Sequence, residues 1–111
     1  MFSLLSPAPD FPPVANAGDD VTIRLPVTSV QLNGAGSTDD RFIVSYRWEL
    51  TSPTDGNVVL TNLYSPVVDV TNLVDAGTYV FTLTVEDSKF QTSSNNVTVT
   101  VLEGKLGSKK Q

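Results

Sequence analysis

Two residue types that carry much of protein chemistry are missing from this chain, which contains no cysteine and no histidine. Without cysteine there is no disulfide, and without either residue there is no ordinary structural zinc site. A nucleophilic triad needs a base, usually histidine, and a cysteine nucleophile is absent as well. We therefore expect a protein that is not an enzyme and that has no cofactor, apart from the calcium ion considered below.

Long apolar runs and basic residues are also scarce. No apolar run approaches the ~20 residues that a membrane-spanning helix needs, and residues 1–5 lack the basic start and cleavage site of a signal peptide. Between Pro13 and Glu103 the chain has four basic and eleven acidic residues, a net charge of −7. Such a surface repels phosphate backbones. We expect no nucleic-acid partner and no direct insertion of this segment into a membrane.

What the chain does contain is a series of short segments in which apolar and polar residues alternate. Alternation with a period of two buries one face of a β-strand and leaves the other in solvent. β-Branched residues dominate these segments, as is usual in strands. The alternating segments, separated by turn residues, are 21–25, 30–33, 44–50, 58–60, 68–71, 79–86 and 96–101.

This pattern predicts an all-β fold, an immunoglobulin-like β-sandwich of about seven strands without a disulfide. No stretch of eleven or more residues shows helical spacing. We assign residues 12–103 to the sandwich domain. Residues 1–11 are rich in proline and are assigned to a linker or tail, and residues 104–111 are assigned to a second linker or tail.

Three large side chains are predicted to form the structural core. Trp48 lies mid-strand among Val44, Tyr46 and Leu50, which we expect to point inward with it. Tyr79 begins the longest strand after Asp75-Ala76-Gly77-Thr78, the arrangement of a tyrosine corner. Phe81, together with Leu32, is expected to fill the space that a disulfide occupies in related sandwiches.

Carboxylates are the remaining candidates for site chemistry. In an immunoglobulin-like strand order, the loops at 34–41 and 87–91 lie at one end, which would bring Asp39, Asp40 and Asp87 together, with Asn16 and Asp19 near them. Calcium is bound by six to eight such oxygen ligands. These residues therefore predict a candidate calcium site, although their spacing matches no compact calcium loop. The alternative is that they are solvated loop acids.

Two surface features suggest modification and contact. Asn96-Val97-Thr98 is an N-glycosylation sequon, and Asn96 should face solvent because Val97 points inward; a chance triplet is the alternative. Phe42 and Phe90 fall outside the alternating segments and should lie at the same loop end. They form a candidate contact patch, unless they tuck against the edge of the sandwich.

Several motifs together resemble a known family. They are Pro12-Pro13-Val14-Ala15-Asn16-Ala17-Gly18-Asp19, then Leu32-Asn33-Gly34, then Tyr46-Arg47-Trp48, and Gly77-Thr78-Tyr79-Val80-Phe81-Thr82-Leu83-Thr84-Val85-Glu86-Asp87. The chain resembles the PKD (polycystic kidney disease) domain family over nearly all of residues 12–102. After the tryptophan this chain has Glu49-Leu50, where many family members have Asp-Phe-Gly-Asp-Gly. In this respect the chain is similar to the subtype in the dyslexia-associated protein and adeno-associated virus receptor ectodomains.

The resemblance implies an extracellular module, secreted or part of a membrane protein's ectodomain, with no catalytic residues. Such modules space neighbouring domains and mediate protein contact or cell adhesion, so the expected partners are a protein ligand or neighbouring PKD-like domains. The alternative is an accessory spacer or carbohydrate-binding module of a secreted bacterial hydrolase, such as a chitinase or protease. Carbohydrate is therefore a second partner class that the sequence leaves open.

Overall fold

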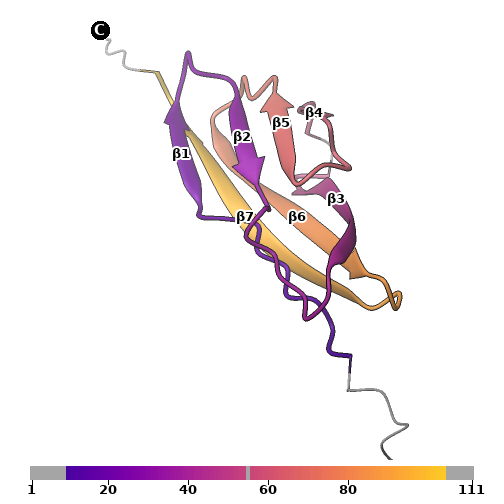
Figure 1. The fold of residues 1–111 in the computed structure, drawn as a ribbon. Coiled ribbons are helices and arrows are strands. Elements are labelled where there is room, and N and C mark those ends of the chain that lie inside the picture. The colour runs from indigo at the N-terminus through magenta and orange to yellow at the C-terminus, as the bar shows by residue number, and fades with distance from the viewer. Residues whose placement is uncertain (1–9, 55, 105–111) are drawn as a thin grey trace, which may run out of the picture.

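A computed structural model describes residues 10–54 and 56–104, which form seven strands in two sheets (Figure 1). One sheet has the order β1-β7-β6-β3 and the other β2-β5-β4. The described ranges contain no helix, and so none that could cross a bilayer. The strands are β1 (Val21–Arg24), β2 (Val30–Asn33), β3 (Ile43–Ser52), β4 (Val59–Thr61), β5 (Val67–Thr71), β6 (Gly77–Asp87) and β7 (Thr92–Leu102). The all-β sandwich predicted from the sequence is confirmed.

The alternation of side chains explains why the two sheets stack. From Tyr79 onward in β6 and from Val97 onward in β7, every second residue is buried, and the residues between them are partly exposed. These two antiparallel strands pair in continuous register from Gly77–Val101 to Glu86–Thr92. The buried positions of both sheets face each other and form one hydrophobic core, as expected when each sheet has one apolar face.

The centre of the core holds the side chains that the sequence singled out. Trp48, Phe81 and Leu32 are at most 2 % exposed. Gly34 lies against this cluster, because a Cβ atom there would come 2.4 Å from Leu83 Cδ2 and 3.1 Å from Trp48 Cζ2. A side chain at position 34 would therefore displace the core, which accounts for glycine in the Leu32-Asn33-Gly34 motif.

Tyr79 forms the tyrosine corner that the sequence predicts. Its hydroxyl donates a hydrogen bond of 2.7 Å to the backbone carbonyl oxygen of Asp75. Burial, with a smaller effect from the Asp75 charge, raises the pKa of Tyr79 above its ordinary value, so the phenol remains a donor at neutral pH. The hydrogen bond joins the β5–β6 connection to the first residues of β6.

One predicted core position is wrong. Val44, expected to point inward with Tyr46 and Trp48, is 51 % exposed. The pairing of β3 with β6 shifts register between Ile43 and Ser45, a β-bulge. Because a bulge inserts one residue and reverses the alternation beyond it, Ile43 packs against the core and Val44 turns outward.

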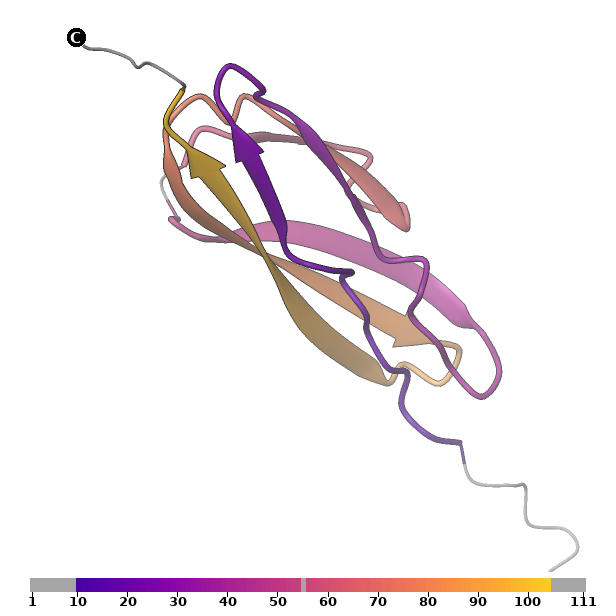
Figure 2. The same cartoon turned by 90° about the vertical axis from the view of Figure 1, so that its left-hand side faces the viewer.

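The two ends of the described chain lie at opposite ends of the sandwich (Figures 1 and 2). The chain enters beside the β6–β7 turn and leaves at the far end, after β7. Asp10 and Phe11, assigned to the tail from the sequence, contact the domain: Arg41 Nε lies 3.5 Å from Asp10 Oδ1, and the Phe11 amide donates to Asp40 Oδ2 at 3.2 Å. Most of the two predicted tails lies outside the described residues.

Candidate contact surface and acidic cluster

The end of the sandwich where the chain enters gathers three carboxylates. One oxygen from each of Asp10, Asp39 and Asp40 lies within 4.8 Å of the others. Asp39 and Asp40 come from the β2–β3 connection, whereas Asp10 is placed there by the entering segment. Gln91 Nε2 fixes that segment by donating to the Asp10 carbonyl oxygen at 3.2 Å. The sequence could not reveal Asp10 as a member, since its contacts with Arg41 and Gln91 span about 30 and 80 positions of the chain.

Asp87, the third residue of the predicted calcium site, is not a member of this group. Its side chain is buried and accepts three hydrogen bonds within the β6–β7 turn: from the Lys89 amide, the Gln91 amide and Gln91 Nε2, at 2.9 to 3.0 Å. A carboxylate satisfied in this way is a structural element of the turn. Asn16, expected near the site, instead accepts the Gly18 amide with its own side-chain oxygen.

The cluster shifts the pKa values of two of its members in opposite directions. Burial raises the pKa of Asp10 above its ordinary value, and the neighbouring Asp40 adds to this. The hydrogen bond from the Phe11 amide lowers the pKa of Asp40, against a smaller opposing effect of burial. Asp40 is therefore the more acidic of the two, and Asp10 is the member whose negative charge is poorly compensated.

Three oxygens of the cluster have no hydrogen-bond donor among the described residues. They are both carboxylate oxygens of Asp10 and Oδ1 of Asp39, all shielded from solvent. Arg41 lies near Asp10 but is 3.5 Å away and nearly half exposed. A buried carboxylate oxygen without a donor is costly, and a divalent cation is one group that satisfies several such oxygens at once.

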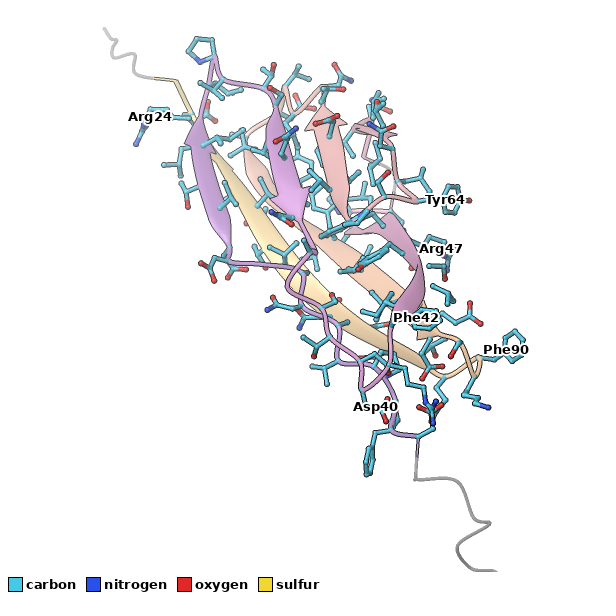
Figure 3. The ribbon with its side chains drawn as sticks, in the orientation of Figure 1. Arg24, Asp40, Phe42, Arg47, Tyr64 and Phe90 are labelled. Carbon is cyan, nitrogen blue, oxygen red and sulfur yellow. The ribbon has the colours of Figure 1, made fainter. Side chains whose placement is uncertain are left out.

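Phe42 and Phe90 lie at this same end and point into solvent (Figure 3). They are 61 % and 84 % exposed, so they do not tuck against the sandwich. Their elements are neighbours, since Ile43 pairs with Asp87 where β3 begins and β6 ends. Phe11, beside Asp40, is also more than half exposed. Three of the four phenylalanines that the structure describes are thus exposed at one end of the domain.

Asn96 lies on the solvent-facing side of β7, as the sequence predicts for a glycan acceptor. It is exposed, and its side-chain oxygen accepts a hydrogen bond from the Thr82 hydroxyl at 2.8 Å. The Thr82 hydroxyl, on β6, also hydrogen-bonds with the Thr51 hydroxyl on the neighbouring strand β3. The outer face of the larger sheet is a hydroxyl-rich surface with Asn96 near its middle.

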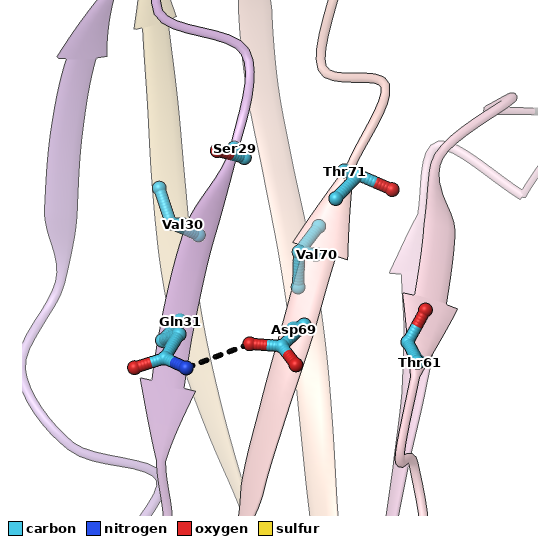
Figure 4. Close-up of a pocket in the computed structure, with 7 residues that line it drawn as sticks. All are labelled: Ser29, Val30, Gln31, Thr61, Asp69, Val70 and Thr71. Atoms are coloured by element: carbon cyan, nitrogen blue, oxygen red, sulfur yellow. Dashed lines mark hydrogen bonds between the residues drawn. The ribbon is translucent and has the colours of Figure 1, made fainter.

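A shallow hollow of about 580 Å³ lies on the outer side of the smaller sheet (Figure 4). Gln31 on β2 donates to Asp69 on β5 at 2.7 Å along its floor. Sugar-binding platforms present aromatic rings to the ligand, and none of the lining residues is aromatic. The hollow is lined by Ser29, Val30, Gln31, Thr61, Asp69, Val70 and Thr71.

A family comparison identifies the fold. The model described as "K319L-like, PKD domain" matches residues 17–101, from the segment before β1 almost to the end of β7. The chain belongs to this PKD domain family. The resemblance suggested by the tyrosine corner, Trp48 and the β6 motif is thereby confirmed.

Relatives of this PKD domain are parts of much longer proteins. The mouse dyslexia-associated protein KIAA0319-like protein is 47 % identical over 100 residues, which is 90 % of this chain and 9 % of the mouse protein. Human low-density lipoprotein receptor-related protein 11 is 45 % identical over 93 residues, 84 % of this chain and 18 % of its own length. The domain thus spans a small fraction of the relatives that it matches.

Solved structures agree with the family assignment. The PKD domain from KIAA 1837 protein superposes with a TM-score of 0.77 at 46 % identity, covering 86 % of this chain and 92 % of that one. The PKD domain of human KIAA0319 gives 0.67 at 26 % identity, covering 89 % and 88 %. A carbohydrate-binding module of the β-sandwich superfamily gives 0.62 at 23 % identity, covering 94 % and 39 %, which shows a shared fold alone.

Proposed function

We propose that this PKD domain is a non-catalytic extracellular module that spaces neighbouring domains and makes protein contacts through the end that bears Phe42 and Phe90. The observation that supports this most is the combination of chain ends at opposite ends of the sandwich with large aromatic side chains exposed beside one of them. Exposed aromatic clusters are typical of protein interaction sites. An extracellular location is supported by the similarity to a relative named as a receptor-related protein, low-density lipoprotein receptor-related protein 11.

The alternative, a sugar-binding accessory module, has less support. Carbohydrate platforms need coplanar rings on one surface, whereas Tyr64 lies on the flank of the domain, well apart from Phe42 and Phe90 (Figure 3). The likeness to a carbohydrate-binding module concerns the fold only. Retention of the purified chain on insoluble chitin or cellulose would favour this alternative, and we expect none.

Photo-crosslinking in the parent protein tests the protein-contact role. A photoreactive phenylalanine analogue replaces Phe90, and the parent protein is displayed on its own cells and irradiated. We expect a covalent adduct to a polypeptide, either another protein or another domain of the same chain. The matched control carries the analogue at Tyr64, which is 73 % exposed but lies on the flank. Equal adduct yields at the two positions would contradict the proposal.

We further propose that the acidic cluster binds calcium, which is favoured by the three shielded oxygens without donors. Asp10, Asp39 and Asp40 would supply ligands from two separate segments, so the ion would tie the entering segment to the β2–β3 connection. Hard carboxylate oxygens supplied by two separate segments suit calcium, which accepts irregular coordination, more than magnesium, which requires near-octahedral geometry.

Calorimetric titration tests the calcium proposal. We expect heat of binding with calcium, a much weaker signal with magnesium, and loss of the calcium signal in Asp39→Asn. Asp75→Asn, which alters an exposed acid at the far end, is the control and should leave binding unchanged. A flat calcium trace for the unaltered chain would rule the site out.

A further inference from the structure

Asn33 is the only one of the seven asparagines in the chain that precedes a glycine. An asparagine side-chain amide is open to attack by the backbone nitrogen of the next residue. The succinimide ring that forms releases ammonia, and water opens it to aspartate or isoaspartate. A following glycine favours this reaction because it has no Cβ atom and is conformationally free. Asn33-Gly34 is therefore the position at which the unfolded chain is most susceptible to deamidation.

In the folded domain, the side chain of Asn33 is accessible. Asn33 is the last residue of β2 and is exposed, so water reaches its amide group. Its Oδ1 accepts a hydrogen bond from the Ala35 amide at 2.8 Å. A donor on a carbonyl oxygen stabilises the negative charge that develops there when the carbon is attacked. The group that would be attacked is thus accessible and already polarised.

The attacking nitrogen, by contrast, is engaged by the fold. Gly34 is buried, and its N–H donates to the Pro66 carbonyl oxygen at 2.7 Å, one step beyond the pairing of β2 with β5. The nitrogen attacks after losing its proton, which would leave two buried acceptors facing each other. Ring closure would also rotate the Asn33–Gly34 link out of the extended geometry of a strand. The folded backbone therefore opposes a reaction that the side chain permits.

The core fixes the segment that carries this acceptor. Trp48, which is 1 % exposed, donates from Nε1 to the Ser65 carbonyl oxygen at 3.2 Å. The Trp48 backbone amide also donates to the Leu63 carbonyl oxygen at 2.9 Å. The Pro66 carbonyl follows directly in the chain. Protection of the asparagine therefore depends on tertiary contacts of the tryptophan and not on the local sequence.

We propose that Asn33 is a latent deamidation site: the Gly34–Pro66 hydrogen bond protects it in the folded domain, and opening of this end of β2 permits its irreversible conversion. In the reaction, the deprotonated Gly34 nitrogen bonds to Asn33 Cγ, and the side-chain nitrogen gains a proton and leaves as ammonia. Water then cleaves either C–N bond of the imide. Cleavage at Cγ gives aspartate, and cleavage at the Asn33 main-chain carbonyl gives isoaspartate. Nothing is oxidised or reduced, and water is the sole co-reactant.

The two products differ in how well they fit the fold. Aspartate keeps the length of the backbone and an oxygen that can accept the Ala35 amide. Isoaspartate adds one methylene to the main chain directly before Gly34, where a Cβ atom would come 2.4 Å from Leu83 Cδ2. The Asn33 carbonyl oxygen is also confined, since a Cβ atom at Gly18 would lie 3.0 Å from it. Isoaspartyl chains should therefore be less stable than aspartyl chains.

Peptide mapping by mass spectrometry tests the protection. The 111-residue chain is incubated at mildly alkaline pH in buffer and in guanidinium chloride above its unfolding midpoint, and the conversion of amide to acid is followed at each asparagine. We expect conversion at Asn33 to be about tenfold or more slower in buffer, because a group that reacts only from an open state is slowed by the opening equilibrium. Asn96, which precedes a β-branched valine, is the internal control and should react slowly in both. Equal rates at Asn33 in the two conditions, or an unfolded chain in which Asn33 reacts no faster than Asn96, would overturn the proposal.

Two conservative variants test whether the contacts around Pro66 provide this protection. Trp48→Phe removes the donor to the carbonyl that precedes Pro66, whereas Tyr79→Phe removes a donor to a backbone carbonyl beyond the far end of β5. Compared at equal free energy of unfolding, Trp48→Phe should speed conversion in the folded state about fivefold more, as expected for the loss of one hydrogen bond. Equal rates in the two variants would show that Asn33 reacts only after global unfolding and would overturn the role of the Gly34–Pro66 bond.

The unequal fit of the two products is measured by denaturation. Isoaspartyl and aspartyl chains from the guanidinium incubation are separated by chromatography and refolded, and Asn33→Asp serves as the reference for the aspartyl form. We expect the isoaspartyl chains to unfold at a lower denaturant concentration than this variant. Identical midpoints would contradict the tight fit at Gly34.

Discussion

At the scale of single residues, the acidic cluster is the most informative feature. Asp10 and Asp40 lie in the same group, yet their pKa values shift in opposite directions because burial dominates at Asp10 and a backbone amide dominates at Asp40. A raised pKa in the folded state means that ionisation of Asp10 opposes folding. A lowered pKa means that ionisation of Asp40 favours it.

Neutralising these two residues should therefore change stability with opposite signs. In calcium-free buffer at pH 7, we expect Asp10→Asn to raise the thermal midpoint and Asp40→Asn to lower it. The favourable contribution of Asp40 is lost as pH falls through its lowered pKa, and the cost of ionised Asp10 disappears below its ordinary value of 3.8. Both differences should shrink near about pH 3, as measured by calorimetry. Shifts of the same sign at pH 7 would contradict this account.

Asn96 allows a second prediction at this scale. Because its side chain is exposed on β7 and heads an Asn-Val-Thr sequon, secretion from a eukaryotic cell should yield protein with a glycan at this position. Peptide mapping by mass spectrometry measures the occupancy. Asn96→Gln should abolish the glycan without unfolding the domain, since only the bond from Thr82 is altered. Wholly unmodified Asn96 in secreted protein would refute the prediction.

At the scale of elements, the β6–β7 turn shows how one buried carboxylate organises one end of the sandwich. Asp87 accepts hydrogen bonds from two amides and one side chain of the residues that follow it, and the Phe90 amide donates to its carbonyl oxygen at 3.1 Å. The turn therefore holds Lys89 and Phe90 in fixed positions. The outward positions of Lys89 and Phe90 thus depend on a carboxylate that is itself buried.

Removing this carboxylate should both destabilise the turn and release Phe90. We expect Asp87→Ala to cost about 1.5–3 kcal/mol, the range for hydrogen bonds to a charged group, measured by urea denaturation. Asp87→Asn keeps one acceptor oxygen and should cost less. Glu86→Gln, next to it on the outer face, is the control. An Asp87→Ala variant as stable as the unaltered chain would show that the turn does not depend on these bonds.

At the scale of the whole molecule, the pairing of β1 with β7 determines how the domain responds to tension. The two strands are parallel, with Val21 opposite Val99 and Arg24 opposite Leu102. Force on the two chain ends pulls parallel neighbouring strands in opposite directions along their axes, so their hydrogen bonds are loaded together in shear. A module that spaces other domains on a surface would benefit from this resistance.

Single-molecule pulling between the chain ends tests this mechanical role. The Leu25 amide donates to the Leu102 carbonyl, and in a parallel pair alternate residues of the strand donate likewise, which places Ile23 among the donors. Ile23→Pro removes that donor and should lower the unfolding force clearly. Ile23→Ala loses side-chain packing but keeps the amide, and should lower the force less. Equal losses in both variants would show that the hydrogen bonds do not bear the load.

Much of the fold could be predicted from local pattern alone. Trp48, Tyr79 and Phe81 lie where period-two alternation and the tyrosine-corner motif place them. Val44 was misplaced because a bulge leaves no mark in the alternation of a single strand. The position of Phe42 and Phe90 at one end of the sandwich could be predicted from the expected strand order, together with the absence of alternation around those residues.

The sequence by itself determined the class of fold and most of the core, since these follow from side-chain periodicity, and it determined that no disulfide can form, since the chain has no cysteine. Only the tertiary structure decided which acids lie together. Asp10 joins Asp39 and Asp40 through contacts that span tens of residues, whereas the Asp87 carboxylate accepts hydrogen bonds within its own turn. The pairing of partners distant in the chain depends on how loops and ends close over the sheets, which the pattern of any one strand does not specify.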